Sequence, residues 1–202
     1  MSAMRIFVTL ILASLAVLTV STGNPLRAAE PAPQTETATL TTPKQRLDSL
    51  FADLKKERDE AKARQLADRI RLEWQDSGSA TVNLLMQWAD KAIADDKKPV
   101  ALDILDQVIA LAPNYVEGWN RRATLHYQMG NYRKSMSDIN RVLAIEPRHF
   151  GAIAGMATML GAAGKDELAM RAWEQFLDIY PSDRKAQEQL GELAEKLAGS
   201  RT

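Results

Sequence analysis

The side chains that most often carry catalytic chemistry are scarce in this chain, and they do not gather. There is no cysteine, which excludes disulfides, thiolate metal sites and cysteine nucleophiles. There are only two histidines, His126 and His149, so a zinc site built on three histidines is excluded. They are 23 residues apart, not at the i,i+4 spacing of a metal-binding helix pair. We expect His126 to be a core residue satisfied by a neighbour and His149 to be an exposed loop residue.

Two further catalytic patterns are also missing. The glycines Gly151, Gly155, Gly161 and Gly164 suggest a phosphate-binding loop, but they fall in a predicted helix, no strand precedes them and the Lys-Ser/Thr ending is absent. The serines are few, and none has the surroundings of a nucleophile elbow. The sequence therefore predicts a protein that is not an enzyme and needs no metal and no cofactor.

The charges are balanced and mixed along the chain. The 202 residues include 26 Lys and Arg and 26 Asp and Glu, so the formal charge is zero. Nucleic-acid binders usually carry a clear basic excess. We therefore expect no nucleic-acid partner. The charge run at 55–60 mixes both signs, with opposite charges three or four residues apart, which is typical of a solvated helix end.

An apolar run near the start indicates export. Ile6–Val20 is interrupted only by three hydroxyl residues and would form a helix of roughly 22 Å at 1.5 Å per residue. A bilayer core is about 30 Å thick, so the run suits a signal peptide better than a spanning helix. We expect a signal peptide at 1–23, cut before Asn24; a cut after Ala29 is a poorer alternative. The other alternative is an uncleaved membrane anchor, the only membrane contact that the sequence indicates.

Residues 24–43 differ from the rest of the chain in composition. They contain four prolines and several threonines and almost no large apolar side chain. Proline removes backbone donors and restricts its neighbour, so this segment is predicted to be a disordered tether. From Lys44 the chain is rich in helix formers. We expect a helical domain at 44–198 and a short tail at 199–202.

The strongest pattern in the sequence is a period of 34 residues. Pro113, Pro147 and Pro181 follow this spacing. Other columns keep the same spacing and a matching size: Gly130 and Gly164; Ala101, Ser135 and Ala169; Leu105, Ile139 and Trp173; Val108, Val142 and Phe176. A fixed period of this size indicates stacked supersecondary units.

Each period contains two helical patterns. Apolar residues recur at helical spacing before and after a turn at Gly130 or Gly164, and a proline ends each second helix. The predicted units are 82–115, 116–149 and 150–183. Trp88 is assigned to the apolar pattern of the first unit. A degenerate unit is predicted at 44–77, and Ser182 or Asp183 is predicted to cap a last helix with a polar outer face.

The pattern resembles the tetratricopeptide repeat, a 34-residue helix–turn–helix unit. The unit 116–149 carries the resemblance through Trp119, Arg122, Ala123, His126, Ser135, Ile139 and Pro147. Arg122 departs from the family pattern, which has leucine there. In a common variant of the family this arginine accompanies an aspartate in the second helix, so the resemblance implies an Arg122–Asp138 ion pair.

The resemblance implies an all-α solenoid of helical hairpins: three clear repeats, one degenerate N-terminal repeat and a C-terminal capping helix. It also implies that first-helix residues line a concave face that binds a protein or peptide. These residues are Asn83, Met86, Gln87, Asp90, Asn120, Arg121, Thr124, Tyr127, Gln128 and Thr158. The third unit is rich in Gly and Ala there, which fits either a binding hollow or close helix packing.

The same resemblance argues against one known ligand class. Some family members hold an acidic C-terminus in a lysine and asparagine clamp. The corresponding positions here are Met86 and Asp90, and only Arg121 is basic. We therefore expect an exported, non-enzymatic protein-interaction module in the bacterial periplasm. We do not expect it to bind acidic chaperone tails. The alternative is a membrane-tethered or self-associating scaffold, which includes a homo-oligomer.

Overall fold

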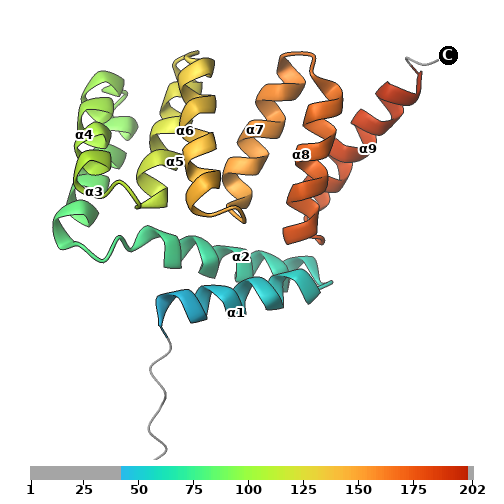
Figure 1. Ribbon diagram of the computed structural model, residues 1–202, viewed down its shortest axis with the longest axis horizontal. Helices are drawn as coiled ribbons and strands as arrows, with labels where there is room; N and C mark the ends of the chain where they lie inside the picture. Colours follow the sequence, from blue (N-terminus) through green and yellow to red (C-terminus); the bar gives the residue numbers. More distant parts are fainter. Residues whose placement is uncertain (1–41, 200–202) are drawn as a thin grey trace, which may run out of the picture. The chain divides into compact units, whose positions relative to one another are not determined.

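The computed structural model describes residues 42–199, which belong to one compact unit of the chain. The regular elements of these residues are all α-helices, as predicted (Figure 1). They are α1 (Pro43–Lys56), α2 (Glu60–Gln75), α3 (Ala80–Ala94), α4 (Lys98–Leu111), α5 (Val116–Gln128), α6 (Tyr132–Ile145), α7 (Phe150–Ala162), α8 (Asp166–Ile179) and α9 (Arg184–Gly199). The predicted signal peptide and nearly all of the predicted tether lie outside the described residues.

The helices α3 to α8 form three hairpins whose bounds follow the predicted units. Pro113, Pro147 and Pro181 each follow the C-cap of a second helix and occupy the same place in the connector to the next hairpin. The helix after the last connector is α9, where Asp183 accepts a hydrogen bond from the Ala186 backbone amide at 2.9 Å. The predicted repeat is therefore confirmed. Among the described helices, none is long and apolar enough to cross a bilayer.

In the turn within each hairpin, one residue after the first helix has a left-handed backbone conformation. Gly130 and Gly164 have φ of 75° and 69°, and the amide after each bonds back to a carbonyl five residues earlier. This is a Schellman ending. Asp96 occupies the equivalent place in the first hairpin with φ of 54°, and Asp tolerates this region better than most residues. The sequence pattern does not reveal this third turn because no glycine marks it.

The N-terminal hairpin of α1 and α2 forms over the predicted segment. Thr42 caps α1 in a reciprocal bond with Gln45, and Asp59 caps α2. Leu54 of α1 and Ile70 of α2 are fully buried. The local sequence therefore accounts for both helices.

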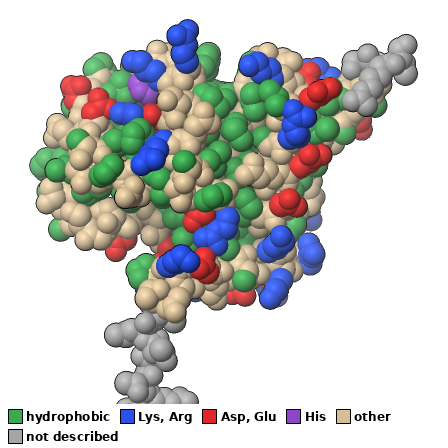
Figure 2. Space-filling model, viewed as in Figure 1, with side chains coloured by type: hydrophobic (Ala, Val, Ile, Leu, Met, Phe, Trp, Pro, Cys, Tyr) green, Lys and Arg blue, Asp and Glu red, His purple; other side chains and the backbone are tan. Residues whose placement is uncertain are grey.

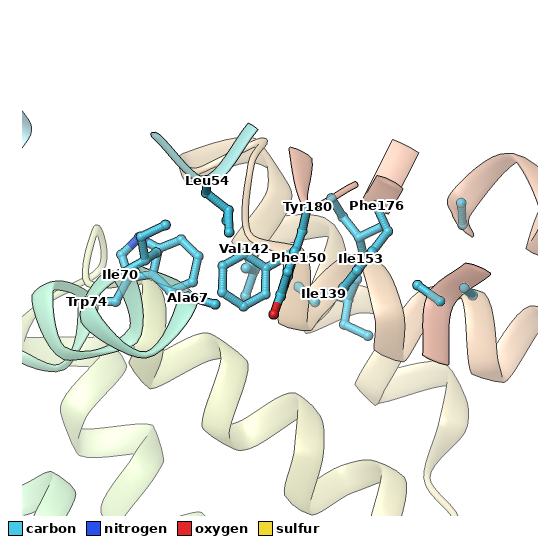
Figure 3. Packing of buried hydrophobic residues seen from close by; sticks show 14 of the residues in the cluster. Leu54, Ala67, Ile70, Trp74, Ile139, Val142, Phe150, Ile153, Phe176 and Tyr180 are labelled. Atoms are coloured by element: carbon cyan, nitrogen blue, oxygen red, sulfur yellow. The ribbon is translucent and has the colours of Figure 1, made fainter. Parts of the chain in front are cut away.

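This hairpin does not stack on α3 and α4 as a repeat would. It lies across the ends of the later hairpins, beside the connectors that contain the repeated prolines (Figure 1). Trp74 and Leu54 share one apolar cluster with Phe150 and Tyr180, as the close view of Figure 3 shows. The buried α3 and α4 residues belong to a second cluster, which also contains Tyr115 and Leu125. The degenerate unit is therefore a docked hairpin rather than the first layer of the stack.

The residue at the third position of each unit determines how closely the preceding hairpin packs. In the second unit this residue is Gly118, where a Cβ atom would lie only 2.8 Å from Val108 Cγ1 of the first hairpin. In the third unit it is the buried Ala152. The first unit has Leu84 there. A leucine prevents a preceding hairpin from approaching as closely as the others do, so the N-terminal hairpin packs elsewhere.

The environment of Trp88 differs from the prediction. The sequence pattern predicts this side chain inside the first unit, which is wrong, because 53% of its surface is exposed. It occupies the position of Arg122, which the preceding helix α4 contacts through Asp106. With no hairpin before α3, the tryptophan faces outward.

Candidate functional site

The first helices of the three hairpins line a groove made of three adjoining hollows. One hollow of about 180 Å³ lies among α5, α6 and α7, and the next, of about 190 Å³, among α2, α5 and α7. A third, of about 350 Å³, lies among α2, α3 and α5. Asn120, Thr124 and Gly151 line both of the first two, and Gln75, Glu117 and Arg121 line both of the last two. The three hollows are therefore one continuous surface.

The first hollow, which we call the apolar hollow, has an apolar floor. Ala123, Ile139, Gly155 and Met159 line it, and Asn120, Thr124, Tyr127 and Thr158 stand at its polar rim. A Cβ atom at Gly155 would lie 3.5 Å from Ile139 Cδ1, an ordinary contact distance. Glycine is therefore not required there for close helix packing, unlike Gly118. Because Gly155 has no side chain, the hollow keeps space for a side chain of another molecule.

The middle hollow is organised by a buried histidine. His149 Nδ1 accepts a hydrogen bond from the Ala152 amide at 3.0 Å, so we assign the ring proton to Nε2, which lies 3.0 Å from Glu117 Oε1. The ring stacks on Trp74 with centroids 4.1 Å apart. We expected His149 to be an exposed loop residue; this is wrong, because the docking of α2 buries it to 2% exposure.

Glu117 is held as a carboxylate in this nearly buried place. Burial on its own would raise its pKa, but the hydrogen bonds from His149 and from Asn120 Nδ2, at 2.9 Å, favour the charged form. The pKa of Glu117 therefore lies below its usual range. The same bond fixes the Asn120 side chain at the rim shared by two hollows.

The third hollow contains the single predicted basic residue of the groove, and that residue is paired. Arg121 Nε lies 3.2 Å from Asp90 Oδ1. Met86 and Asp90 both line this hollow, as predicted. The charge of Arg121 is thus balanced inside the groove, and no cluster of cations faces a ligand there.

The structure brings most of the predicted concave-face residues together. Nine of the ten line one of the three hollows: Asn83, Met86, Gln87, Asp90, Asn120, Arg121, Thr124, Tyr127 and Thr158. Gln128 is exposed but lines none of them. Asn83 is bonded to Asp76 and Ser77 of the preceding loop, so it shapes the groove end.

The α2 residues of the groove could not be found from the sequence. Arg71, Trp74 and Gln75 line the middle hollow, and Leu72, 62% exposed, lines the third. They reach the groove only because the N-terminal hairpin docks across the connectors. No periodic signal indicates such a position. The groove is therefore a composite of repeat helices and one helix outside the stack.

Two other predictions concern the outer side of the second hairpin. Arg122 Nε and Nη2 each lie 2.8 Å from an oxygen of Asp138, so the predicted ion pair is present. Arg122 also bonds Asp106 at 2.6 Å. His126 is buried as expected, but within residues 42–199 its Nδ1 has no hydrogen-bond partner, which corrects the expectation of a satisfied ring.

The stacked hairpins and their shared groove define a helical-repeat protein with an interaction surface. No family model matches the chain. It is 60% identical over 204 residues to a TPR repeat-containing protein of Rhizobium etli, with 100% of both chains covered. The chain therefore belongs to the tetratricopeptide repeat family.

More distant relatives agree with this assignment. Over 97 residues the chain is 27% identical to small glutamine-rich tetratricopeptide repeat-containing protein 2 of Saccharomyces cerevisiae, and the match spans 48% of the chain and 28% of that relative. Among solved structures, the first TPR of Spaghetti (RPAP3) bound to the HSP90 peptide SRMEEVD has a TM-score of 0.55 at 21% identity, covering 61% of this chain and 96% of that one. The MamA protein has a TM-score of 0.52 at 14% identity, covering 74% and 81%. These structures show the same fold.

Proposed function

We propose that the groove binds a peptide segment of a partner protein and seats one of its apolar side chains in the apolar hollow. The observation that carries this proposal is the unfilled space above Gly155, bordered by Ile139, Met159 and Tyr127 within a continuous groove. Concave sites with an apolar floor and a few fixed polar groups are typical of ligand binding. In this proposal the protein acts as an interaction module.

The charges of the groove select against one kind of peptide. The Spaghetti repeat domain was solved with SRMEEVD, an acidic peptide. Here Arg121 is balanced by Asp90, Arg71 of the middle hollow is paired with Asp68 at 2.6 Å, and Glu117 adds a negative charge. A carboxylate of the ligand at this end would meet Asp90 and Glu117, while both arginines already have acidic partners. The proposed ligand is therefore an apolar peptide segment without a terminal acidic cluster.

Filling the apolar hollow tests this function directly. Peptides are selected from a random display library on the parent chain, and their affinities are measured by calorimetry for the parent, Gly155→Leu and Gly191→Leu. Gly191 lies on exposed α9 with no atom within 4 Å of a built Cβ, so it is the matched control. The leucine at 155 should abolish binding, and the leucine at 191 should leave it unchanged. Equal affinity of all three proteins would refute the groove assignment.

We further propose that the protein acts after export, with residues 1–23 as a cleaved signal peptide. The apolar run Ile6–Val20 and the small residues before Asn24 support this proposal. Mass spectrometry of the protein from a periplasmic fraction should give a chain that begins at Asn24. An intact N-terminus in the membrane fraction would support the uncleaved anchor, and a cytoplasmic full-length chain would rule out export.

A further inference from the structure

The third hollow of the groove carries an excess of negative charge. The face of the molecule shown in Figure 2 has charges of both signs, interspersed, and the formal charge of the whole chain is zero. Among the residues that the structure describes, the charged ones that line the third hollow are three acids and one base: Asp76, Asp90, Glu117 and Arg121. Arg121 offsets Asp90, and Glu117 is held as a carboxylate, so the net charge of these four residues is −2.

The cations next to the hollow do not cancel this charge. Arg46 acts on Asp76 through its field, but its guanidinium is bonded to Glu73, with Nε 3.0 Å from Oε1 and Nη2 3.0 Å from Oε2. Arg71 of the middle hollow is paired with Asp68. Each of these arginines thus brings an acid of its own, and the excess of negative charge in the hollow remains.

The Tyr115 hydroxyl, which lies in a side chain that lines the third hollow, is subject to the same excess. Burial is the main cause that raises the pKa of Tyr115, and Glu117 raises it further. Asp76 and Asp90 act in the same direction, whereas Arg121 acts against them. The charges that reach this hydroxyl are therefore mainly negative.

Several polar groups of this part of the groove can only accept hydrogen bonds from a ligand. The Tyr115 hydroxyl donates to the Gln75 carbonyl at 2.8 Å, and the Thr124 hydroxyl donates to the Asn120 carbonyl at 3.0 Å. A hydroxyl has a single hydrogen, so both groups have only lone pairs left. Among the described residues, the two hydrogen bonds that Asp76 accepts both end on Oδ1, which leaves Oδ2 as a further acceptor. A ligand group that donates hydrogen bonds and carries positive charge matches this set.

The apolar side chains of the hollow suit the stem of a long basic residue. Leu72 of α2 is 62% exposed there, and Met86 of α3 lines the same hollow. Lysine and arginine lay their methylene stems along apolar surface and keep the charged head at polar groups. A purely apolar group would instead remove water from the carboxylates without replacing its hydrogen bonds.

We propose that the third hollow seats a lysine or arginine side chain of the same peptide whose apolar side chain fills the apolar hollow. This inference rests on the proposed peptide-binding function and adds the charge of the ligand. The stem of the basic side chain packs on Leu72 and Met86, and its head donates to Asp76 and Asp90. Because the middle hollow joins the other two, the peptide has its basic residue at the α3 end of the groove and its apolar residue at the α7 end.

The test starts from peptides selected on the full chain from a random display library. The strongest peptides should share one Lys or Arg at a fixed distance from an apolar residue. Calorimetry compares one such peptide with a copy that has methionine in place of the basic residue. On the parent chain the methionine copy should bind about tenfold more weakly, since hydrogen bonds to charged groups are the stronger ones. Added salt should reduce this difference.

The double variant Asp76→Asn/Asp90→Asn locates the basic residue. Asparagine keeps a side-chain oxygen for the hydrogen bonds of the loop 76–79, and circular dichroism checks the fold. On this variant the two peptides should bind about equally. Asp103→Asn/Asp178→Asn is the matched control, because it changes the net charge by the same amount at two exposed acids that line none of the three hollows. It should keep the tenfold preference.

Gly155→Leu separates this proposal from the proposed function. If it leaves the affinity unchanged, the peptide lies outside the groove and the proposed function fails. If it abolishes binding while the parent binds both peptides equally, the groove assignment stands and the seat for a basic residue is wrong. A preference for the basic peptide that survives Asp76→Asn/Asp90→Asn also overturns that seat. Failure to select any peptide overturns both proposals.

Discussion

The imidazole of His149 lies flat on the indole of Trp74, with centroids 4.1 Å apart and ring planes 15° apart. This contact joins α7 of the third hairpin to α2 of the N-terminal hairpin. The Tyr115 hydroxyl adds a second link by donating to the Gln75 carbonyl at 2.8 Å. Through these contacts a helix outside the repeat stack becomes a wall of the groove.

Replacing His149 by alanine should loosen this wall. The substitution removes the cap of α7, the partner of the buried Glu117 and the stacking surface of Trp74. We expect a loss of about 2–4 kcal/mol in the free energy of unfolding, measured in urea. Trypsin should also cleave faster at the loop 57–59. Tyr132→Ala, an exposed aromatic away from the hairpin, is the control. Unchanged stability and cleavage would show that the hairpin is held without His149.

The Arg122–Asp138 pair should contribute strongly to stability because Asp138 is only 4% exposed. Arg122→Leu restores the leucine of the family pattern but leaves a buried carboxylate without its cation. We expect a cost of about 3 kcal/mol in urea unfolding. Arg64→Ala breaks only a surface pair with Glu60 and should cost less than about 1 kcal/mol. A cost for Arg122→Leu as small as that of the surface variant would mean that the pair contributes little.

His126 should make the stability depend on pH. Burial lowers the pKa of His126 below 6.5; Asp138 and Asp106 act against this effect, whereas Arg122 and Lys134 add to it. As the pH falls, His126 is therefore protonated in the unfolded chain before it is protonated in the folded one. The contribution of the neutral His126 ring to the free energy of unfolding is complete above pH 6.5. It is lost as the pH falls toward the lower pKa of the folded state, by at most about 1.4 kcal/mol per pH unit.

Unfolding in urea from pH 8 to pH 5 checks this prediction. His126→Leu should lack this part of the decline. Since His149 is present in both proteins, the difference between the two curves isolates His126. Parallel curves for the parent and the variant would contradict the assignment.

Local patterns predicted the repeat well, because its turns, prolines and small residues are dictated within single hairpins. Ser135 illustrates this: its small side chain fits between helices and donates to the Ala123 carbonyl at 2.7 Å. Nine groove residues followed from their place on first helices. The Arg122–Asp138 pair followed from two positions in one hairpin.

The docking of the N-terminal hairpin could not be predicted in this way. It depends on contacts between residues far apart in the sequence, such as Arg148 with Asp48 at 2.8 Å. The sequence predicted His149 to be an exposed loop residue because no local pattern indicates that α2 packs against it. The clue that was present is Leu84, a large residue where the other units have Gly118 and Ala152. It explains both the displaced hairpin and the exposure of Trp88.

The measurement that tests the groove most directly is methyl NMR of the methionines during titration with a selected peptide. Met159 lines the apolar hollow and Met86 lines the third hollow, whereas Met170 of α8 lines none of the three. A peptide in the groove should shift the Met159 methyl resonance most and leave that of Met170 in place. A bound peptide that shifts Met170 and leaves both groove methionines unchanged would show that the ligand binds outside the groove.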